Sequence, residues 1–197
     1  MNEFLYHNSY FNKKYQDKLD ARFWTFKIAL NLFLQFKGKN IVETGCLREV
    51  NDYGAGYSTY LFGEFCDKYK CRFWTCDKDK KNLDLAKRIT MDFVLSIDYV
   101  LSDSKVFLWG FKEPIDLLYL DALDCDPDNR VKTEAAQQFQ LDEIKIVYPH
   151  LSKRAIVLLD DNNHPWGGKT KLSKRFLAKN GFVNIMDYQQ SLWIRDL

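Results

Sequence analysis

Apolar and polar residues alternate along this chain in blocks of two kinds. Short, mainly apolar runs of strand length are separated by longer segments in which apolar residues recur every three or four positions, as on one face of a helix. The runs predicted to be strands are 41–43, 72–76, 97–101, 115–120 and 154–159. The helices predicted after them include 58–69, 79–88, 131–148 and a stretch that ends at 178, and 182–187 and 191–195 follow as a final pair of strands. This alternation predicts an α/β fold, with a mostly parallel sheet covered by helices on both faces.

The segment before the first strand carries a helical pattern of its own. Its apolar residues recur at spacings of three and four: Leu19, Phe23, Phe26, Leu30 and Phe33. The pattern predicts one helix over 12–36, and Gly38 is expected to end it. We therefore divide the chain into an N-terminal helical segment, residues 1–37, that packs on or caps a main domain over residues 38–197.

The stretch from Asn40 to Thr59, NIVETGCLREVNDYGAGYST, organises the main domain. A short strand ends at Glu43, a turn with three glycines follows (Gly45, Gly54 and Gly56), and a helix begins at Ser58. This layout brings backbone N–H groups and a helix N-terminus close to a ligand. The spacing differs from G-x-G-x-x-G, so it does not indicate the dinucleotide fingerprint, and a loop without a ligand is the alternative interpretation.

Polar residues follow all five predicted parallel strands. They are Glu43, Asp77, Asp103, Asp121 and the run Asp160–Asn162. The carboxyl ends of parallel strands meet at one edge of a sheet, so these residues are expected to lie together. Asp77 ends the second strand, where doubly wound folds hold a ribose, although it could instead cap the next helix.

The amino-acid composition limits which classes of protein this chain can belong to. The 197 residues are 46% hydrophobic and 16% aromatic, which indicates a globular domain with a core of its own. The net charge of +2 does not favour a nucleic-acid partner. We find no apolar run long enough to span a membrane and no signal-peptide pattern, and we expect a cytoplasmic protein. The five cysteines are interpreted as reduced thiols, partly in the core.

Several short motifs stand at the ends of these strands. They are VETG at 42–45 with GAGYST at 54–59, CDKD at 76–79, LSDS at 101–104 and DLLYLDA at 116–122. With them, residues 38–195 resemble the class I S-adenosylmethionine-dependent methyltransferases. The resemblance implies a Rossmann-like doubly wound sheet of seven strands, mostly parallel with an antiparallel C-terminal hairpin. The motif LLDDNN at 158–163 is similar to that of small-molecule O-methyltransferases of the catechol and sugar or macrolide types.

The resemblance also implies roles for individual residues. The cofactor would be S-adenosylmethionine, held near its methionine end by Glu43, Gly45, Gly54, Gly56 and Ser58, at its ribose by Asp77 and at its adenine by Asp103 and Ser104. Asp121 would border both the cofactor and a divalent cation such as Mg²⁺. The other metal ligands would be Asp161 and Asn162 in the catechol type, or Asp160 and Asp161 in the sugar type, and the register stays open.

The chain departs from the catechol-type pattern at two places. Residues 47–53, LREVNDY, lengthen the glycine turn and could cover the cofactor or contact a substrate. Asp124 stands where those enzymes carry a lysine, so a general base must come from elsewhere. His164 could serve near neutral pH, and Lys169 only if it were desolvated, although Lys169 is expected to face solvent. His164 could equally be structural, and the aspartates at 160–161 could simply cap a turn.

These observations favour a metal-assisted O-methyltransferase that acts on a small hydroxylated acceptor. One alternative is a metal-independent RNA or protein methyltransferase, and another is a cofactor-binding module without activity. The chain lacks an Asn/Asp-Pro-Pro-aromatic motif, which counts against methylation of base amino groups. The acceptor and the oligomeric state stay open, and a homodimer is compatible with the sequence.

Overall fold

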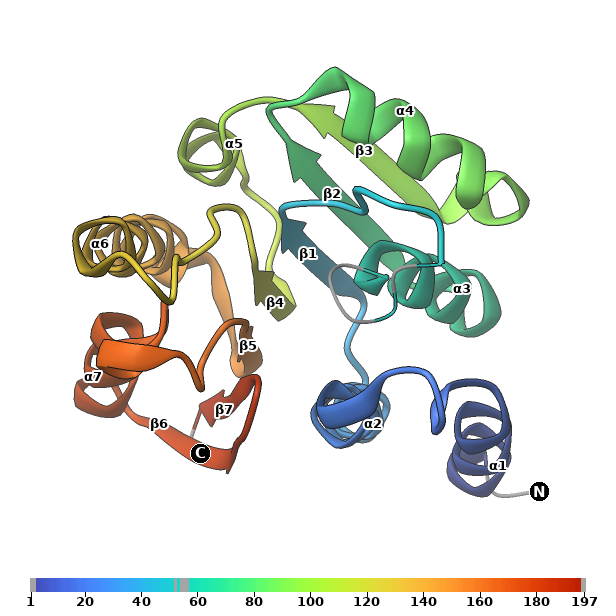
Figure 1. Ribbon diagram of the computed structural model, residues 1–197. Helices are drawn as coiled ribbons and strands as arrows, with labels where there is room; N and C mark the ends of the chain where they lie inside the picture. The colour runs from blue at the N-terminus through green and yellow to red at the C-terminus, as the bar shows by residue number, and fades with distance from the viewer. Residues whose placement is uncertain (1–2, 52, 54–56, 196–197) are drawn as a thin grey trace.

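All seven predicted strands lie in one sheet. The computed structural model describes residues 3–51, 53 and 57–195, with side chains from residue 9 onward. The strand order is β3-β2-β1-β4-β5-β7-β6 (Figure 1). The strands are β1 (Asn40–Thr44), β2 (Arg72–Asp77), β3 (Ile97–Leu101), β4 (Ile115–Leu120), β5 (Leu151–Leu159), β6 (Phe182–Asp187) and β7 (Ser191–Arg195). Strands β1 to β5 are parallel, and β7 runs antiparallel to β5 and to β6. The predicted Rossmann-like sheet is confirmed.

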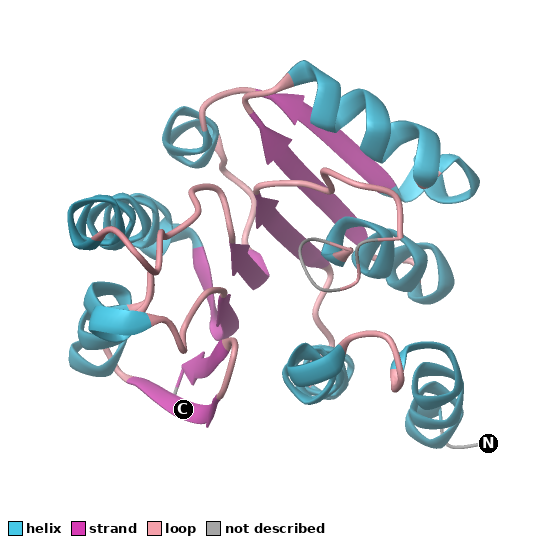
Figure 2. Ribbon diagram, viewed as in Figure 1, coloured by secondary structure: helices cyan, strands magenta, loops and turns pink. Residues whose placement is uncertain are grey.

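Helices cover both faces of the sheet (Figure 2). The α-helices are α1 (Glu3–Tyr15), α2 (Phe23–Gln35), α3 (Ser58–Tyr69), α4 (Lys80–Ile89), α5 (Ser104–Gly110), α6 (Arg130–Val147) and α7 (Lys171–Lys179). Short 3-10 helices are η1 (Asp20–Arg22), η2 (Met91–Ser96), η3 (Tyr148–His150) and η4 (Pro165–Gly167). Helices α2, α3 and α4 lie on one face, with α1 outside them, and α5, α6 and α7 lie on the other.

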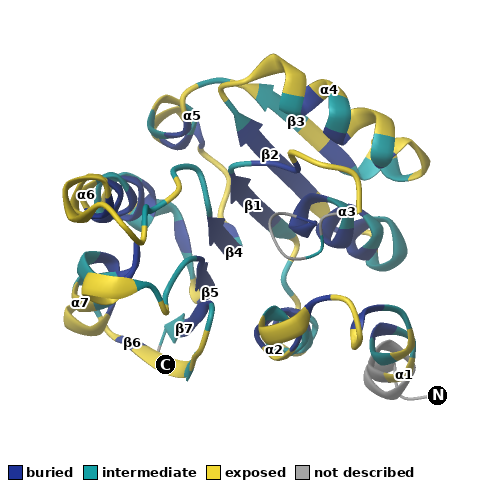
Figure 3. Ribbon diagram, viewed as in Figure 1, coloured by how far each residue is buried: buried dark blue, intermediate teal, exposed yellow. Residues whose placement is uncertain are grey.

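Each central strand is buried on both faces (Figure 3). Along β1, Ile41 packs into the core under α2 and α3, whereas its neighbour Val42 packs into the core under α5, α6 and α7. Leu117 and Leu118 of β4 alternate in the same way. This two-sided burial explains why the central strands read as nearly continuous apolar runs.

The prediction of one helix over 12–36 is wrong. The chain forms α1, then η1, then α2, and Asp20 at the break has a φ of +45°. Leu19 and Phe23 lie on either side of this break, and both are buried in the same core. The apolar spacing therefore continues across a bend in the backbone, which is why the pattern alone does not show it.

The end of α2 also differs in detail from the prediction. Lys37, rather than Gly38, takes the left-handed conformation, with a φ of +59°. The N–H of Gly38 donates to the carbonyl of Phe33, and that of Lys37 donates to Leu34, which is the Schellman closure of a helix.

Other boundaries agree closely with the sequence. The predicted bounds of α3, β3, β4, β6 and β7 are confirmed, and the other predicted helices differ by one or two residues at most ends. The sequence did not locate α5. Within the described part of the chain, no helix combines the length and the apolar character needed to cross a lipid bilayer.

Candidate functional site

Two adjoining cavities open at the carboxyl ends of the parallel strands, at the edge where the sequence predicts a site. Their volumes are about 50 Å³ and about 240 Å³. They share five lining residues, Gly45, Asp77, Lys78, Ala122 and Leu123. We therefore treat them as one groove with a narrow end beside β3 and a wide end beside the turn after β1.

Gly45 forms part of the floor of this groove. Its φ is +82°, and its N–H donates to the carbonyl of Cys76 at 2.8 Å. A Cβ at this position would lie 2.3 Å from the carbonyl oxygen of Asp121. Only glycine combines this backbone angle with such a close approach of two loops. Gly54 and Gly56, the other glycines predicted to serve the cofactor, lie outside the described residues.

Asp77 lies at the junction of the two cavities. Its Oδ2 accepts from the Cys46 N–H and from Asn82 Nδ2, both at 3.2 Å, and its Oδ1 accepts from the Asp79 N–H at 2.7 Å. The residue that caps α4 is Asp79, whose carboxylate accepts from the Lys81 N–H. Asp77 is therefore not the N-cap, and its fixed carboxylate is presented to the groove.

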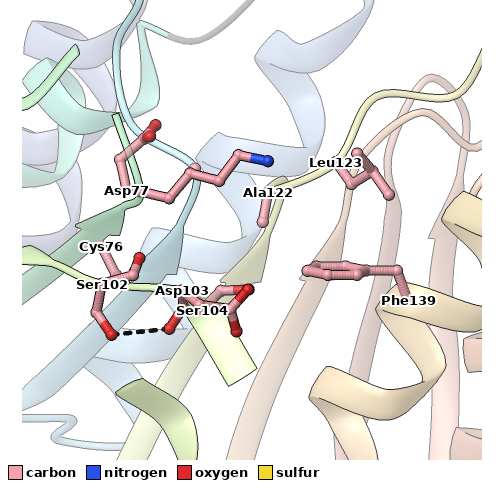
Figure 4. Close-up of a pocket in the computed structure, with 10 residues that line it drawn as sticks. Cys76, Asp77, Ser102, Asp103, Ser104, Ala122, Leu123 and Phe139 are labelled. Atoms are coloured by element: carbon pink, nitrogen blue, oxygen red, sulfur yellow. Dashed lines mark hydrogen bonds between the residues drawn. The ribbon is translucent and has the colours of Figure 1, made fainter. Parts of the chain in front are cut away.

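The narrow end brings together residues from three elements (Figure 4). Asp103 caps α5 by accepting from the N–H groups of Lys105 and Val106, and Ser104 is buried next to it. Across the pocket from these two residues lie Leu123 and the ring of Phe139, which belongs to α6. The sequence analysis missed Phe139, because an aromatic beside the buried stripe of a long helix carries no motif of its own.

Glu43 and Ser58 are buried behind the described groove lining rather than in it. Oε2 of Glu43 accepts from Thr59 Oγ1 at 2.7 Å and from Thr75 Oγ1 at 2.6 Å, and Thr59 Oγ1 in turn accepts from the Leu47 N–H. Burial raises the pKa of Glu43 to about 7, against the lowering effect of its hydroxyl partners. Glu43 thus ties β1, β2 and α3 beneath the turn, and its predicted contact with a cofactor stays a prediction.

Beside the wide end, a buried lysine joins two of the predicted site residues. Lys169 Nζ lies 2.7 Å from Asp121 Oδ1 and 3.4 Å from Asp161 Oδ2, and its side chain is only 1% exposed. The expectation that Lys169 faces solvent is wrong. Burial alone would lower the pKa of Lys169, but the carboxylates of Asp121, Asp161 and Asp160 outweigh it and raise that pKa. Its amine is therefore held in the protonated form, which does not suit the predicted role of general base.

The other two predicted metal ligands are engaged elsewhere. The carboxylate of Asp160 accepts two hydrogen bonds from Arg22, and this ion pair lowers the pKa of Asp160 although burial raises it. The amide oxygen of Asn162 accepts from Thr170 Oγ1 and Lys174 Nζ. The side-chain oxygens of Asp160 and Asn162 that were predicted to bind a metal ion thus already accept hydrogen bonds from the protein, and the metal site stays a prediction. Nothing in the local pattern of the sequence singles out Arg22 as a partner of this region.

His164 adjoins the same cluster from the loop before α7. Its Nε2 lies 3.4 Å from Asp161 Oδ1. Cys125 is close enough that one ligand atom each of Cys125, Asp161 and His164 fall within 4.8 Å of one another. Burial raises the pKa of the Cys125 thiol to about 11, which disfavours a thiolate at neutral pH.

Arg48 and Asp124 line the rim of the wide end. Arg48 Nη1 and Nη2 donate to the two carboxylate oxygens of Asp124, at 2.6 and 3.2 Å. Arg48 belongs to the segment 47–53 that lengthens the glycine turn, so this segment does reach the groove. Asp124, the residue at the expected lysine position, is therefore paired with an arginine.

Comparison with known proteins places the fold. No family model matches the chain, and no curated protein matches it. Among solved structures, the SAH-bound Podospora anserina methyltransferase PaMTH1 is 15% identical, with a TM-score of 0.63 over 99% of this chain and 88% of that one. SMU.1697c, a putative methyltransferase from Streptococcus mutans in complex with SAH, is 12% identical, with a TM-score of 0.59 over 87% and 97%. A putative rRNA-methylase from Clostridium thermocellum is 11% identical, with a TM-score of 0.58 over 81% and 89%. The chain therefore has the fold of the methyltransferases.

Proposed function

We propose that this chain is an S-adenosylmethionine-dependent methyltransferase whose acceptor is a small hydroxylated molecule. The observation that carries the proposal is the carboxylate of Asp77, fixed at the junction of the two cavities. An adenosine that carries the methionine portion at its 5′ carbon fits this layout. Its base would occupy the narrow end between Ser104 and Phe139, and its ribose hydroxyls would donate to Asp77.

The wide end suits the methionine portion. In the proposal this portion extends past Gly45 toward Asp121, which lines the wide end. The sulfonium is a cation, and the carboxylates of Asp121 and Asp161 place negative charge near it. Lys169 and Arg22 offset part of this charge. Carboxylate oxygens at this position favour a bound sulfonium.

Methyl transfer breaks the S–CH3 bond, leaves the electron pair on sulfur, forms an O–CH3 bond and releases the acceptor proton. The residues of the chain chiefly hold the two reactants in line. We assign the released proton to His164. Its Nε2 faces Asp161, which orients the ring, and its Nδ1 is then the nitrogen that can accept the proton.

Calorimetric titration of the purified protein with SAH tests the cofactor assignment. Wild-type protein is expected to bind, and Asp77→Ala is expected to weaken binding by about tenfold or more, because hydrogen bonds to a charged group contribute about 1.5–3 kcal/mol. Asp98→Ala is the matched control, since Asp98 lies at the amino end of β3 and pairs with Arg72 on the surface. Absence of SAH binding by the wild type would remove the proposal.

An acceptor screen then separates this function from its main alternative. Catechols and hydroxylated sugars are expected to accept a labelled methyl group, whereas ribosomal and transfer RNA are not. Likeness in fold to a putative rRNA-methylase is what favours the RNA alternative. If only RNA were methylated, the assignment of a small acceptor would be wrong, whereas the assignment of the cofactor would stand.

A further inference from the structure

We propose that Lys169 takes the place of a divalent cation in this protein, so that its ammonium group is the resident cation shared by Asp121 and Asp161. The inference deepens the proposed function and rests on it, because it concerns how the acceptor end of the same groove is built. The sequence resemblance implies a metal ion bound by these carboxylates, and in our proposal the ammonium group of Lys169 occupies the position of that ion.

The position of the ammonium group supports this assignment. Lys169 Nζ lies 2.7 and 3.4 Å from one oxygen each of Asp121 and Asp161, so it bridges two of the predicted metal ligands. A Mg²⁺ or Ca²⁺ ion would bind such oxygens at about 2.0–2.6 Å. It could not do so without displacing the ammonium group between them.

The backbone holds Lys169 in this position. The Lys169 N–H donates to the carbonyl of Asp161 at 2.9 Å, so the segment 161–169 doubles back on itself. Gly168 has a φ of +58°, and a Cβ there would lie 2.2 Å from the same carbonyl oxygen. Gln137 Nε2, from α6, donates to the carbonyl of Gly168 at 2.8 Å. These backbone contacts therefore fix the position from which the buried side chain of Lys169 extends.

The neighbouring carboxylate groups, which could also bind a metal ion, form ion pairs with arginine side chains. Asp124 offers an oxygen within 4.8 Å of those of Asp121 and Asp161, which makes a geometric trio that could hold a metal ion. However, both oxygens of Asp124 accept from Arg48, and both oxygens of Asp160 accept from Arg22. Asp121, Asp124, Asp160 and Asp161 thus each have a cationic partner from the chain itself.

Lys169 is accordingly a positioning residue. Its charge holds the carboxylate of Asp161 toward Asp121, and the other oxygen of Asp161 then faces His164. Without a metal ion to polarise the acceptor hydroxyl, the proton of that hydroxyl must pass to a side chain. The imidazole of His164 lies next to Asp161, where it can accept this proton.

Binding of Mn²⁺ to the cofactor-free protein, followed by electron paramagnetic resonance, tests the inference. The wild type is expected to show no saturable binding up to about 1 mM Mn²⁺, which prefers the same oxygen ligands as Mg²⁺. Lys169→Met leaves Asp121 and Asp161 without their cation and is expected to bind Mn²⁺ at least about tenfold more tightly. Lys171→Met, two residues further on, is the matched control and is expected to behave as the wild type.

Two outcomes would overturn the inference. The first is tight Mn²⁺ binding by the wild type that Asp161→Asn abolishes. The second is a folded Lys169→Met protein with no gain in Mn²⁺ affinity. If Lys169→Met does not fold, the wild-type titration with Asp161→Asn decides alone. SAH titration of the same samples keeps the two proposals apart, because lack of SAH binding contradicts the function and leaves the metal result standing.

Discussion

Arg22 and Asp160 form a buried, bidentate ion pair, although they are separated by 138 positions in the sequence. Arg22 Nε donates to Oδ1 and Nη2 donates to Oδ2, each at 3.0 Å, and the two side chains are 13% and 3% exposed. The pair joins the bend between α1 and α2 to the end of β5. Next to it, Thr25 of α2 hydrogen-bonds Gln190 in the turn before β7. The N-terminal helices are thereby tied to the edge of the sheet that carries the candidate site.

Replacement of Arg22 is expected to destabilise the protein strongly. Arg22→Ala leaves the carboxylate of Asp160 buried without a partner, which typically costs about 3–5 kcal/mol. Urea unfolding measures the loss. Arg130→Ala is the control, because Arg130 forms an exposed pair with Glu134 on one helix and such pairs contribute about 1 kcal/mol or less.

A double variant checks that the effect comes from the unpaired charge. Arg22→Met with Asp160→Leu removes both charges and fills a similar volume, and it is expected to recover most of the lost stability. If Arg22→Ala costs no more than Arg130→Ala, the pair does not hold the N-terminal helices in the way we describe.

The raised pKa of Glu43 is expected to make the free energy of unfolding depend on pH. Burial raises its pKa from 4.5 to about 7 in the folded protein. Between these values the folded state keeps a proton that the unfolded state has released, so this group stabilises the fold at low pH and the effect is lost as pH rises to about 7. The difference amounts to about 3 kcal/mol. Glu43→Gln is expected to remove this part of the slope in urea unfolding between pH 5 and pH 8.

Glu143 is expected to contribute to the same pH dependence of the free energy of unfolding. It is buried on α6, and burial raises its pKa to about 7 as well, so some slope is expected to remain in Glu43→Gln. The double variant with Glu143→Gln should have a smaller slope than either single variant. Glu113→Gln, at an exposed position, should follow the wild-type profile. An unchanged slope in both single variants would show that neither acid is protonated in the folded protein at pH 6.

The sheet and the edge that carries the site could be predicted because both depend on local pattern. A parallel strand buried on both faces must be nearly continuously apolar, and the residue after it must stand at the carboxyl edge. Asp77 and Asp121 could therefore be assigned to one groove from their positions alone. Gly45 could be assigned to it too, because a turn that touches a neighbouring loop requires a glycine.

The partners of these residues could not be predicted in the same way. Lys169 and Arg22 are charged residues outside the apolar positions of the pattern, so no period indicates their burial. Lys169 pairs with Asp121 from 48 positions away and Arg22 pairs with Asp160 from 138 positions away, and the spacing of residues along a chain does not record such pairings. For the same reason the sequence suggested a metal ion at Asp121 and Asp161, where the structure places an ammonium group.

Phe139 is expected to contribute to binding of the base. Its ring lines the narrow end opposite Ser104, and Lys105 Nζ lies 4.5 Å from the ring centre. Stacking of a base on an aromatic ring contributes about 1–3 kcal/mol. Phe139→Ala should therefore weaken adenosine binding by about tenfold in calorimetry. Trp109→Ala, an exposed aromatic on α5, should have no effect, and equal adenosine affinity in both variants would place the base elsewhere.

His164 is expected to affect the chemical step and not cofactor binding. His164→Gln keeps a polar side chain beside Asp161 but cannot accept the proton, so kcat should fall by about a hundredfold or more. SAH affinity should stay within about twofold, because His164 does not line the part of the groove assigned to the cofactor. Rates are measured with the acceptor that the screen identifies, and His150→Gln, before β5 at the opposite edge of the sheet, is the control. An unchanged kcat in His164→Gln would transfer the role of base to another group.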